Sequence, residues 1–270
     1  MNVSATHFAP TSPSLAGRAG AVAPPMISVA ALAGVPAWVR ETFGDGVLRH
    51  GNHAAALDIE LIEDQDCFIP QATMTSFLYE VERRAGEENL GLLLTPYLTF
   101  QTYGHWADYV LAAETLRGAI DRAVSTLGYH TSGDRMELSV VRGAARLSYY
   151  NATRGRAGYA HVAVGTAGVL LDLIRSYLSS DWRPELLTLD ILRPRKAAPF
   201  EDAFLCPIAF EANAVSVFFG ARFLNHSRRR HLRTGHLTLE DLARQRFNPT
   251  RPCGRIDSGI AFRVPALRLV

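Results

Sequence analysis

The sequence predicts an α+β fold: a helical N-terminal half, then a small, mostly antiparallel sheet with packed helices, then a short basic, partly helical tail. Three observations support this prediction. Apolar residues recur at helical spacing through much of residues 26–128, whereas apolar and polar residues alternate in short stretches after residue 135. Residues 226–270 contain ten arginines and three acidic residues, a balance of +7, which leaves −5 for residues 1–225.

The composition indicates a folded body with terminal extensions. Of the 270 residues, 48% are hydrophobic and 20% charged, which is enough apolar material for a core. We predict a disordered extension over residues 1–25, a folded body over 26–225 and a basic tail over 226–270. Residues 1–25 are rich in Ala, Pro, Ser and Gly and do not resemble a signal peptide. Because ordered-looking sequence begins at Met26, we treat Met26 as an alternative start. No run approaches the roughly 18 apolar residues of a membrane span, so we expect a cytoplasmic protein without membrane contact.

The helical half contains three well-marked segments. "PQATMTSFLYEVERRAG" begins at Pro70 and ends at Gly86, residues that suit a helix start and stop. "HWADYVLAAETLRGAIDRAVSTLG" predicts two helices, the second capped by Thr115 and ended by Gly128.

The second half changes period. In "RMELSVV" and "RLSYYN" apolar and polar residues alternate on either side of the turn "RGAA", which predicts a β-hairpin. "GYAHVAVGTAGVLLDLIRSYL" returns to helical spacing, and "ELLTLDIL" predicts a strand. "PFEDAFLCPIAFEANAVSVFF" predicts a short helix and then two strands around "EANA", a second hairpin.

No catalytic motif is complete in this sequence. There is no strand-borne G-x-S-x-G, no P-loop and no H-E-x-x-H, so we expect neither an enzyme nor a bound cofactor. His50 and His53 have no carboxylate or thiolate at matching spacing, and we predict no metal site.

A candidate ligand pocket lies in "RLSYYNATRGRAGYAH", at a strand-to-helix junction. Aromatic rings there supply flat apolar contact, while amide, guanidinium and imidazole groups supply placed hydrogen bonds. The alternative is a solvated strand end whose tyrosines cover the core. The predicted ligand-binding residues, two of them from the helical half, are Tyr103, Trp106, Tyr149, Tyr150, Asn151, Arg154 and His161.

Four segments give the chain a family resemblance. "FEDAFLCPIAFEANAVSVFFGARFLN", "LGLLLTPYL", "TYGHWADYVLAAETLRGAIDRAV" and "DCFIP" resemble, in order and spacing, the N-terminal arabinose-binding-type sensor domain of AraC/XylS transcription regulators. The resemblance covers Met26 to Asn225. It implies a domain that binds a small-molecule effector and dimerises, followed by two helix-turn-helix motifs that bind promoter DNA. It does not imply arabinose, because this branch covers varied effectors.

The tail departs from the family pattern. "HLTLEDLARQR" resembles a first helix of a helix-turn-helix, with Thr238 as cap and Asp241 at the capping-box position. Pro252 and Gly254 then leave no room for a recognition helix, so we expect a truncated DNA reader, from either a frameshift or a gene-model error.

Two functions remain open at this stage. The first is an AraC-type regulator with an intact sensor and weak or non-specific DNA contact. The second is a ligand-binding or dimerisation module without DNA binding of its own, which pairs with itself or with a full-length relative. The candidate DNA contacts, for which an ordinary solvated basic stretch is the alternative, are Arg228, Arg229, Arg230, Arg233 and Arg244.

Overall fold

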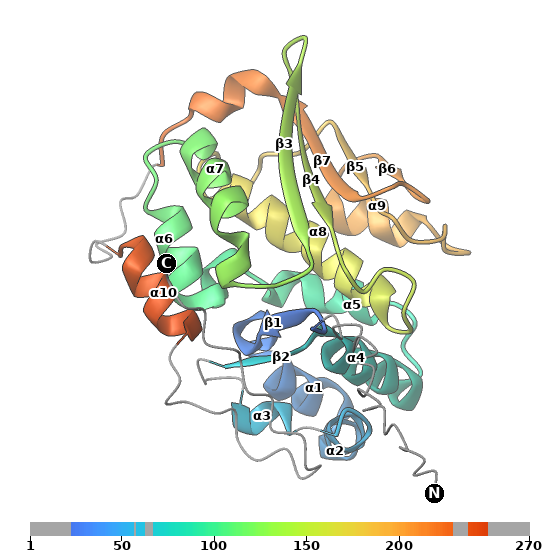
Figure 1. Cartoon of the computed structure of the whole chain (residues 1–270). Helices are drawn as coiled ribbons and strands as arrows, with labels where there is room; N and C mark the ends of the chain where they lie inside the picture. The colour runs from blue at the N-terminus through green and yellow to red at the C-terminus, as the bar shows by residue number, and fades with distance from the viewer. Residues whose placement is uncertain (1–22, 57, 63–66, 229–236, 248–270) are drawn as a thin grey trace, which may run out of the picture.

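The computed structural model describes residues 23–56, 58–62, 67–228 and 237–247, and it has the predicted α+β architecture (Figure 1). The first half contains β1 (Met26–Ser28), η1 (Val29–Leu32), α1 (Val35–Phe43), α2 (Asp45–Ala54), α3 (Ile59–Ile62), β2 (Phe68–Pro70), α4 (Gln71–Ala85), α5 (Leu90–Leu94), η2 (Thr95–Tyr97), η3 (Phe100–Tyr103), α6 (Gly104–Leu111), α7 (Leu116–Thr126) and η4 (Leu127–Tyr129). The rest contains β3 (Arg135–Val141), β4 (Ala144–Tyr150), α8 (Tyr159–Arg175), β5 (Leu186–Thr188), α9 (Ala198–Phe204), β6 (Ile208–Ala209), β7 (Val215–Gly220), η5 (Ala221–Asn225) and α10 (Leu239–Phe247). Here η denotes a 3-10 helix. The prediction of disorder for residues 1–25 falls almost wholly outside the described residues.

The helical predictions for the body are confirmed. Helix α4 ends at Gly86, which adopts the left-handed conformation that suits a glycine C-cap. The hydroxyl of Thr115 accepts a hydrogen bond from the Gly118 amide and caps α7. The sequence did not predict the two-stranded antiparallel sheet of β1 and β2, in which Ile27 pairs with Ile69, because each strand has only three residues.

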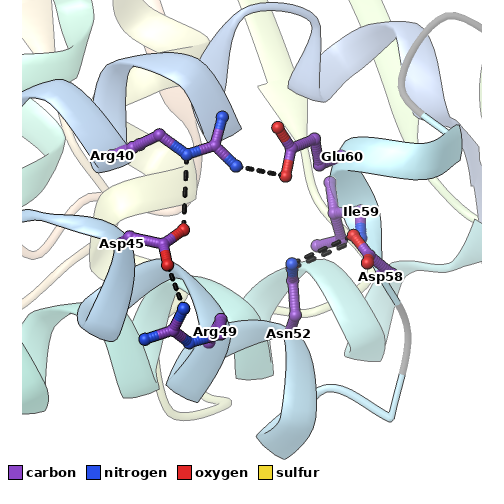
Figure 2. A network of polar contacts seen from close by, with 7 residues as sticks. All are labelled: Arg40, Asp45, Arg49, Asn52, Asp58, Ile59 and Glu60. Carbon is purple, nitrogen blue, oxygen red and sulfur yellow. Dashed lines mark hydrogen bonds and ion pairs between the residues drawn. The ribbon is translucent and has the colours of Figure 1, made fainter.

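Surface ion pairs tie the first three helices together. Figure 2 shows Arg40 of α1 reaching the carboxylates of Asp45 on α2 and Glu60 on α3. Asn52 adds a second link, because its amide nitrogen donates to Asp58 and its carbonyl oxygen accepts from the Ile59 backbone. Such exposed pairs orient the short helices at small energetic benefit.

The main sheet has the strand order β3-β4-β7-β5-β6. The β3–β4 hairpin is confirmed, and it turns at Arg142 and Gly143, which both have positive φ (50° and 82°) as a two-residue type I′ turn requires. Across the sheet Leu147 pairs with Val217 and Val217 with Leu187, and all three side chains are fully buried. This row forms part of the core on one face of the sheet.

The predicted second hairpin is wrong. Strands β6 and β7 flank "EANA" but do not pair with each other, because β5 lies between them. Strand β5 pairs in parallel with β6 and antiparallel with β7. The backbone amides of Glu211 and Ala212 donate to carbonyls of Ile191 and Leu189, so the "EANA" turn is held against the chain that follows β5.

Helix α8 is the centre of the molecule. It lies between the sheet and the N-terminal helices (Figure 1), and it contacts α4, α5 and β7. Gly158 caps its start with φ +78°, and a Cβ there would lie 2.1 Å from the Thr75 carbonyl oxygen on α4. Only glycine fits this approach, so α8 and α4 are locked together at one end.

Candidate functional site

A cavity of about 70 Å³ lies between α8 and the elements that surround its N-terminal half. The helical half and the sheet both contribute to it, so it belongs to the body as a whole. Its lining residues are Ile27, Ala31, Leu32, Val35, Met74, Leu78, Leu94, Leu98, Phe100, Tyr103, Trp106, His130, Met136, Tyr149, Asn151, His161, Val162, Gly165, Thr166, Val169 and Leu170.

Four rings form an aromatic wall in this cavity. The His130 ring lies 4.5 Å from that of Tyr103 and 4.7 Å from that of Trp106, with near-parallel planes, and Phe100 packs 5.2 Å from Trp106. The wall is anchored from behind, because the Trp106 indole donates to Thr126 (2.9 Å) and the Phe100 amide donates to the Asp172 carboxylate (2.8 Å). Burial raises the pKa of Asp172 and of the Tyr103 phenol.

A largely buried polar network extends from Tyr149, a lining residue near the end of β4. The Tyr149 hydroxyl donates to Asp134 at 2.6 Å. Gln71 donates to Thr131 (2.7 Å) and to the other Asp134 oxygen (3.0 Å). Burial, and then the nearby Asp134 carboxylate, raise the pKa of Tyr149 well above its usual value. The Tyr149 hydroxyl is thus neutral and committed to a protein partner.

His161 on α8 is fixed by two hydrogen bonds. Its Nδ1 lies 3.2 Å from the Gly91 amide, which donates to it, and its Nε2 lies 2.9 Å from a Glu82 oxygen. Because Nδ1 accepts, the ring proton is assigned to Nε2, which donates to Glu82. A Cβ on Gly91 would come within 2.9 Å of the His161 Cα, so glycine is what lets α5 approach α8 this closely.

Five of the seven predicted ligand-binding residues line the cavity, and two do not. Tyr103, Trp106, Tyr149, Asn151 and His161 come together there from three stretches of the sequence, 103–106, 149–151 and the start of α8.

Tyr150 and Arg154 lie elsewhere. Tyr150 follows Tyr149 in β4 and therefore points to the opposite face, where its hydroxyl donates to Glu137. Arg154 donates to the carbonyls of Ala212 and Asn213.

Sequence reasoning missed much of the lining. His130 and Thr166 belong to it, as do apolar residues of η1 such as Leu32. Leu32 and Thr166 carried no signal, since an apolar side chain or a helical threonine looks the same in a core as in a cavity. Only the aromatic character of residues 100–130 hinted at the wall.

The predicted DNA contacts are only partly described. Arg229, Arg230 and Arg233 lie outside the described residues. The Arg228 guanidinium donates to the Leu111 carbonyl at 2.8 Å, and Arg244 pairs with Glu240 one turn earlier on α10. The capping box of α10 is confirmed: the Thr238 hydroxyl accepts from the Asp241 amide, and the Asp241 carboxylate accepts from the Thr238 amide. The residues that predict truncation, 248–270, also lie outside.

Metal-binding chemistry has no geometric support in the described part of the chain. His50 lies 3.2 Å from a Glu80 oxygen, and no cluster of three His, Cys, Asp or Glu side chains gathers among those residues. Among the helices described, none combines the length and apolar content needed to cross a bilayer.

Comparison with known proteins gives one family. The model described as the arabinose-binding domain of AraC transcription regulator, N-terminal, matches residues 52–227. No curated protein matches the chain. Among solved structures, the transcriptional regulator CdpR from Pseudomonas aeruginosa is similar, with 15% identity and a TM-score of 0.49. The alignment covers 67% of this chain and 56% of CdpR, so the chain matches little more than half of that protein.

Proposed function

Because the chain belongs to the family defined by the N-terminal arabinose-binding domain of AraC transcription regulators, we propose that residues 26–225 sense a small-molecule effector and thereby regulate transcription. The observation that supports this most is the largely apolar cavity, to which both halves of the body contribute. The proposed contacts are Tyr103, Trp106, Tyr149, Asn151 and His161. We further propose a cytoplasmic protein without catalytic activity.

A physical link between the cavity and the tail supports a regulatory role. His130, in the aromatic wall, directly follows η4, and η4 packs against α10. Leu242 of α10 is 1% exposed. A ligand that prefers one position of the wall would therefore shift the equilibrium between attached and detached α10.

A metabolite screen by thermal shift tests the sensing proposal. A ligand that binds only the folded chain raises its Tm. Val169→Phe and Leu98→Phe each place a ring in the cavity and should abolish the shift. Leu192→Phe, at a side chain 83% exposed and remote from the lining, is the matched control and should leave the shift unchanged. A ligand that still raises the Tm of both cavity variants would show that sensing occurs at a site outside this cavity.

For the tail we propose weak, non-specific phosphate contact by Arg228, Arg229, Arg230, Arg233 and Arg244. Such contact falls steeply with salt and ignores DNA sequence, which gel shifts on the adjacent promoter and on scrambled DNA would measure. Sequence-selective binding would refute the proposal that the reader is incomplete.

The second candidate is a module that acts by pairing, either as a homodimer or with a full-length relative. The protein contacts that already engage Arg228 and Arg244 favour it, because they reduce the cations available to DNA. No gel shift at low salt, together with dimers in sedimentation, would support this candidate over the first.

A further inference from the structure

The chemistry of the cavity lining limits what the cavity can bind. Hydrocarbon and aromatic side chains make up most of the cavity lining, and no Asp, Glu, Lys or Arg is among the described residues that line it. A charged group placed against this lining would therefore lose its hydration without gaining an ion pair, which is costly. This argues for a ligand without charge.

Most polar groups of the cavity lining already form hydrogen bonds within the protein. The Trp106 indole donates to Thr126, and the Tyr149 hydroxyl donates to Asp134. Both ring nitrogens of His161 have partners, on Gly91 and Glu82. A ligand could hydrogen-bond these groups only by breaking bonds that hold the wall in place.

Few lining groups remain for a ligand. Within the described part of the chain, the Tyr103 hydroxyl, the Asn151 amide nitrogen and the Thr166 hydroxyl have no hydrogen-bond partner. Thr166 lies within α8, where a threonine can bond to a carbonyl of the preceding turn. The Tyr103 hydroxyl has no such backbone carbonyl of its own helical turn as an acceptor, and its ring lies in the aromatic wall.

We propose, building on the sensing function above, that the cavity binds a neutral, mainly hydrocarbon molecule with one hydrogen-bonding group, such as a phenol, held through the Tyr103 hydroxyl. A sugar fits poorly, because each buried hydroxyl without a partner weakens binding by about five- to a hundred-fold. A phenol leaves only one such group to satisfy, and its ring packs on the aromatic wall. Benzene-sized ligands occupy cavities of roughly 150 Å³, so the wall must move outward from the present volume of about 70 Å³ to admit the ring.

Four probes of similar size separate the ligand classes. They are toluene, p-cresol, 4-hydroxybenzoate and L-arabinose, tested by thermal shift and calorimetry on the whole chain. We expect p-cresol to bind tightest, toluene about five-fold more weakly for want of one hydrogen bond, and the anion and the sugar at least about a hundred-fold more weakly. Tighter binding of 4-hydroxybenzoate or L-arabinose than of p-cresol would overturn the proposal.

Substitution of one oxygen tests the role of Tyr103. Tyr103→Phe keeps the ring and removes the hydroxyl, so p-cresol should bind about five-fold more weakly while toluene binding stays the same. Tyr97→Phe is the matched control, since Tyr97 is 61% exposed and outside the lining. An unchanged preference for p-cresol over toluene in Tyr103→Phe would refute the assigned role.

The cavity-filling variants separate failure of this inference from failure of the sensing function. Val169→Phe, or Leu98→Phe if the first does not fold, should abolish p-cresol binding. If only sugars or anions bind, and do so in a manner that Val169→Phe removes, the cavity is a sensor site but the ligand class is wrong. If no molecule in the screen binds in a manner that depends on the cavity, both proposals fail.

Discussion

Helices α8 and α10 both begin at a clear helix-start residue, but they bury very different amounts of side chain. Both have well-defined starts, at Gly158 and at Thr238. Helix α8 buries most of its residues among the sheet, α4 and α5. Among the α10 residues whose side chains are described, 239–244, Leu242 alone is buried, while Leu239 is 49% exposed. Burial of one leucine contributes about 1.5–3 kcal/mol, so α10 can detach while the body stays folded. The difference separates a cooperative body from a locally attached helix, and four experiments test it.

The largest effect should come from alkaline pH, which acts on the body. Burial raises the pKa of Tyr103, Tyr149 and Tyr159, and that of Tyr177 to about 12. Each folded-state pKa lies above the unfolded value near 10, so above pH ~10 the unfolded chain releases protons that the folded chain keeps. Stability is therefore complete below pH ~10 and falls above it, by about 5 kcal/mol per pH unit for four such groups.

Absorbance at 295 nm, followed together with circular dichroism, measures this effect. The buried tyrosines should ionise only as the body unfolds. Ionisation of all nine tyrosines near pH 10 with the circular dichroism unchanged would contradict it.

Truncation of a cavity-wall side chain should come next. Phe100 is 1% exposed, and Phe100→Ala should destabilise the body by about 3–5 kcal/mol through lost burial and an enlarged cavity. Leu242→Ala is the counterpart on α10. It should detach the helix without lowering the body's denaturation midpoint. Equal losses from the two variants, measured by urea denaturation, would show that α10 belongs to the cooperative body.

Two glycines of the loop before α8 provide a matched pair. Both have positive φ, but a Cβ on Gly158 would meet the Thr75 carbonyl at 2.1 Å, whereas a Cβ on Gly155 would meet nothing within 4 Å. Gly155→Ala should cost about 1–2 kcal/mol from backbone strain alone. Gly158→Ala should cost that amount and a further 1–3 kcal/mol or so because α8 must shift away from α4. Thermal denaturation of both variants checks the difference, and equal costs would mean that the α4–α8 contact yields easily.

Local patterns predicted the elements, while distant pairing and the cavity depended on contacts that the sequence does not display. Alternation and the Arg142–Gly143 turn were enough for the β3–β4 hairpin. The position of β5 between β6 and β7 was not predictable, because strands of two or three residues carry too little pattern to specify a partner.

Within the candidate site too, local patterns were predictable from the sequence and contacts between distant elements were not. Tyr149 and Tyr150 are equivalent in a motif, but adjacent strand residues face opposite ways, so only one can line the cavity. Leu32 and Thr166 had no signal at all, because their role comes from elements brought together only by folding.

The smallest effect should come from the cap of α10, and it tests whether this helix is held by its own local bonds. Thr238→Ala removes the hydroxyl that accepts from the Asp241 amide, at a cost of about 1 kcal/mol to the helix. Thr238→Ser retains an acceptor and should behave like the parent chain. Hydrogen exchange of the α10 amides should therefore quicken about five-fold in the alanine variant, while exchange in α8 and the body's Tm stay the same.

Because α10 packs against η4, p-cresol binding to the aromatic wall should also alter the hydrogen exchange of the α10 amides. Identical exchange of α10 with and without bound p-cresol would leave cavity and tail as independent units, and the regulatory link through His130 would fall.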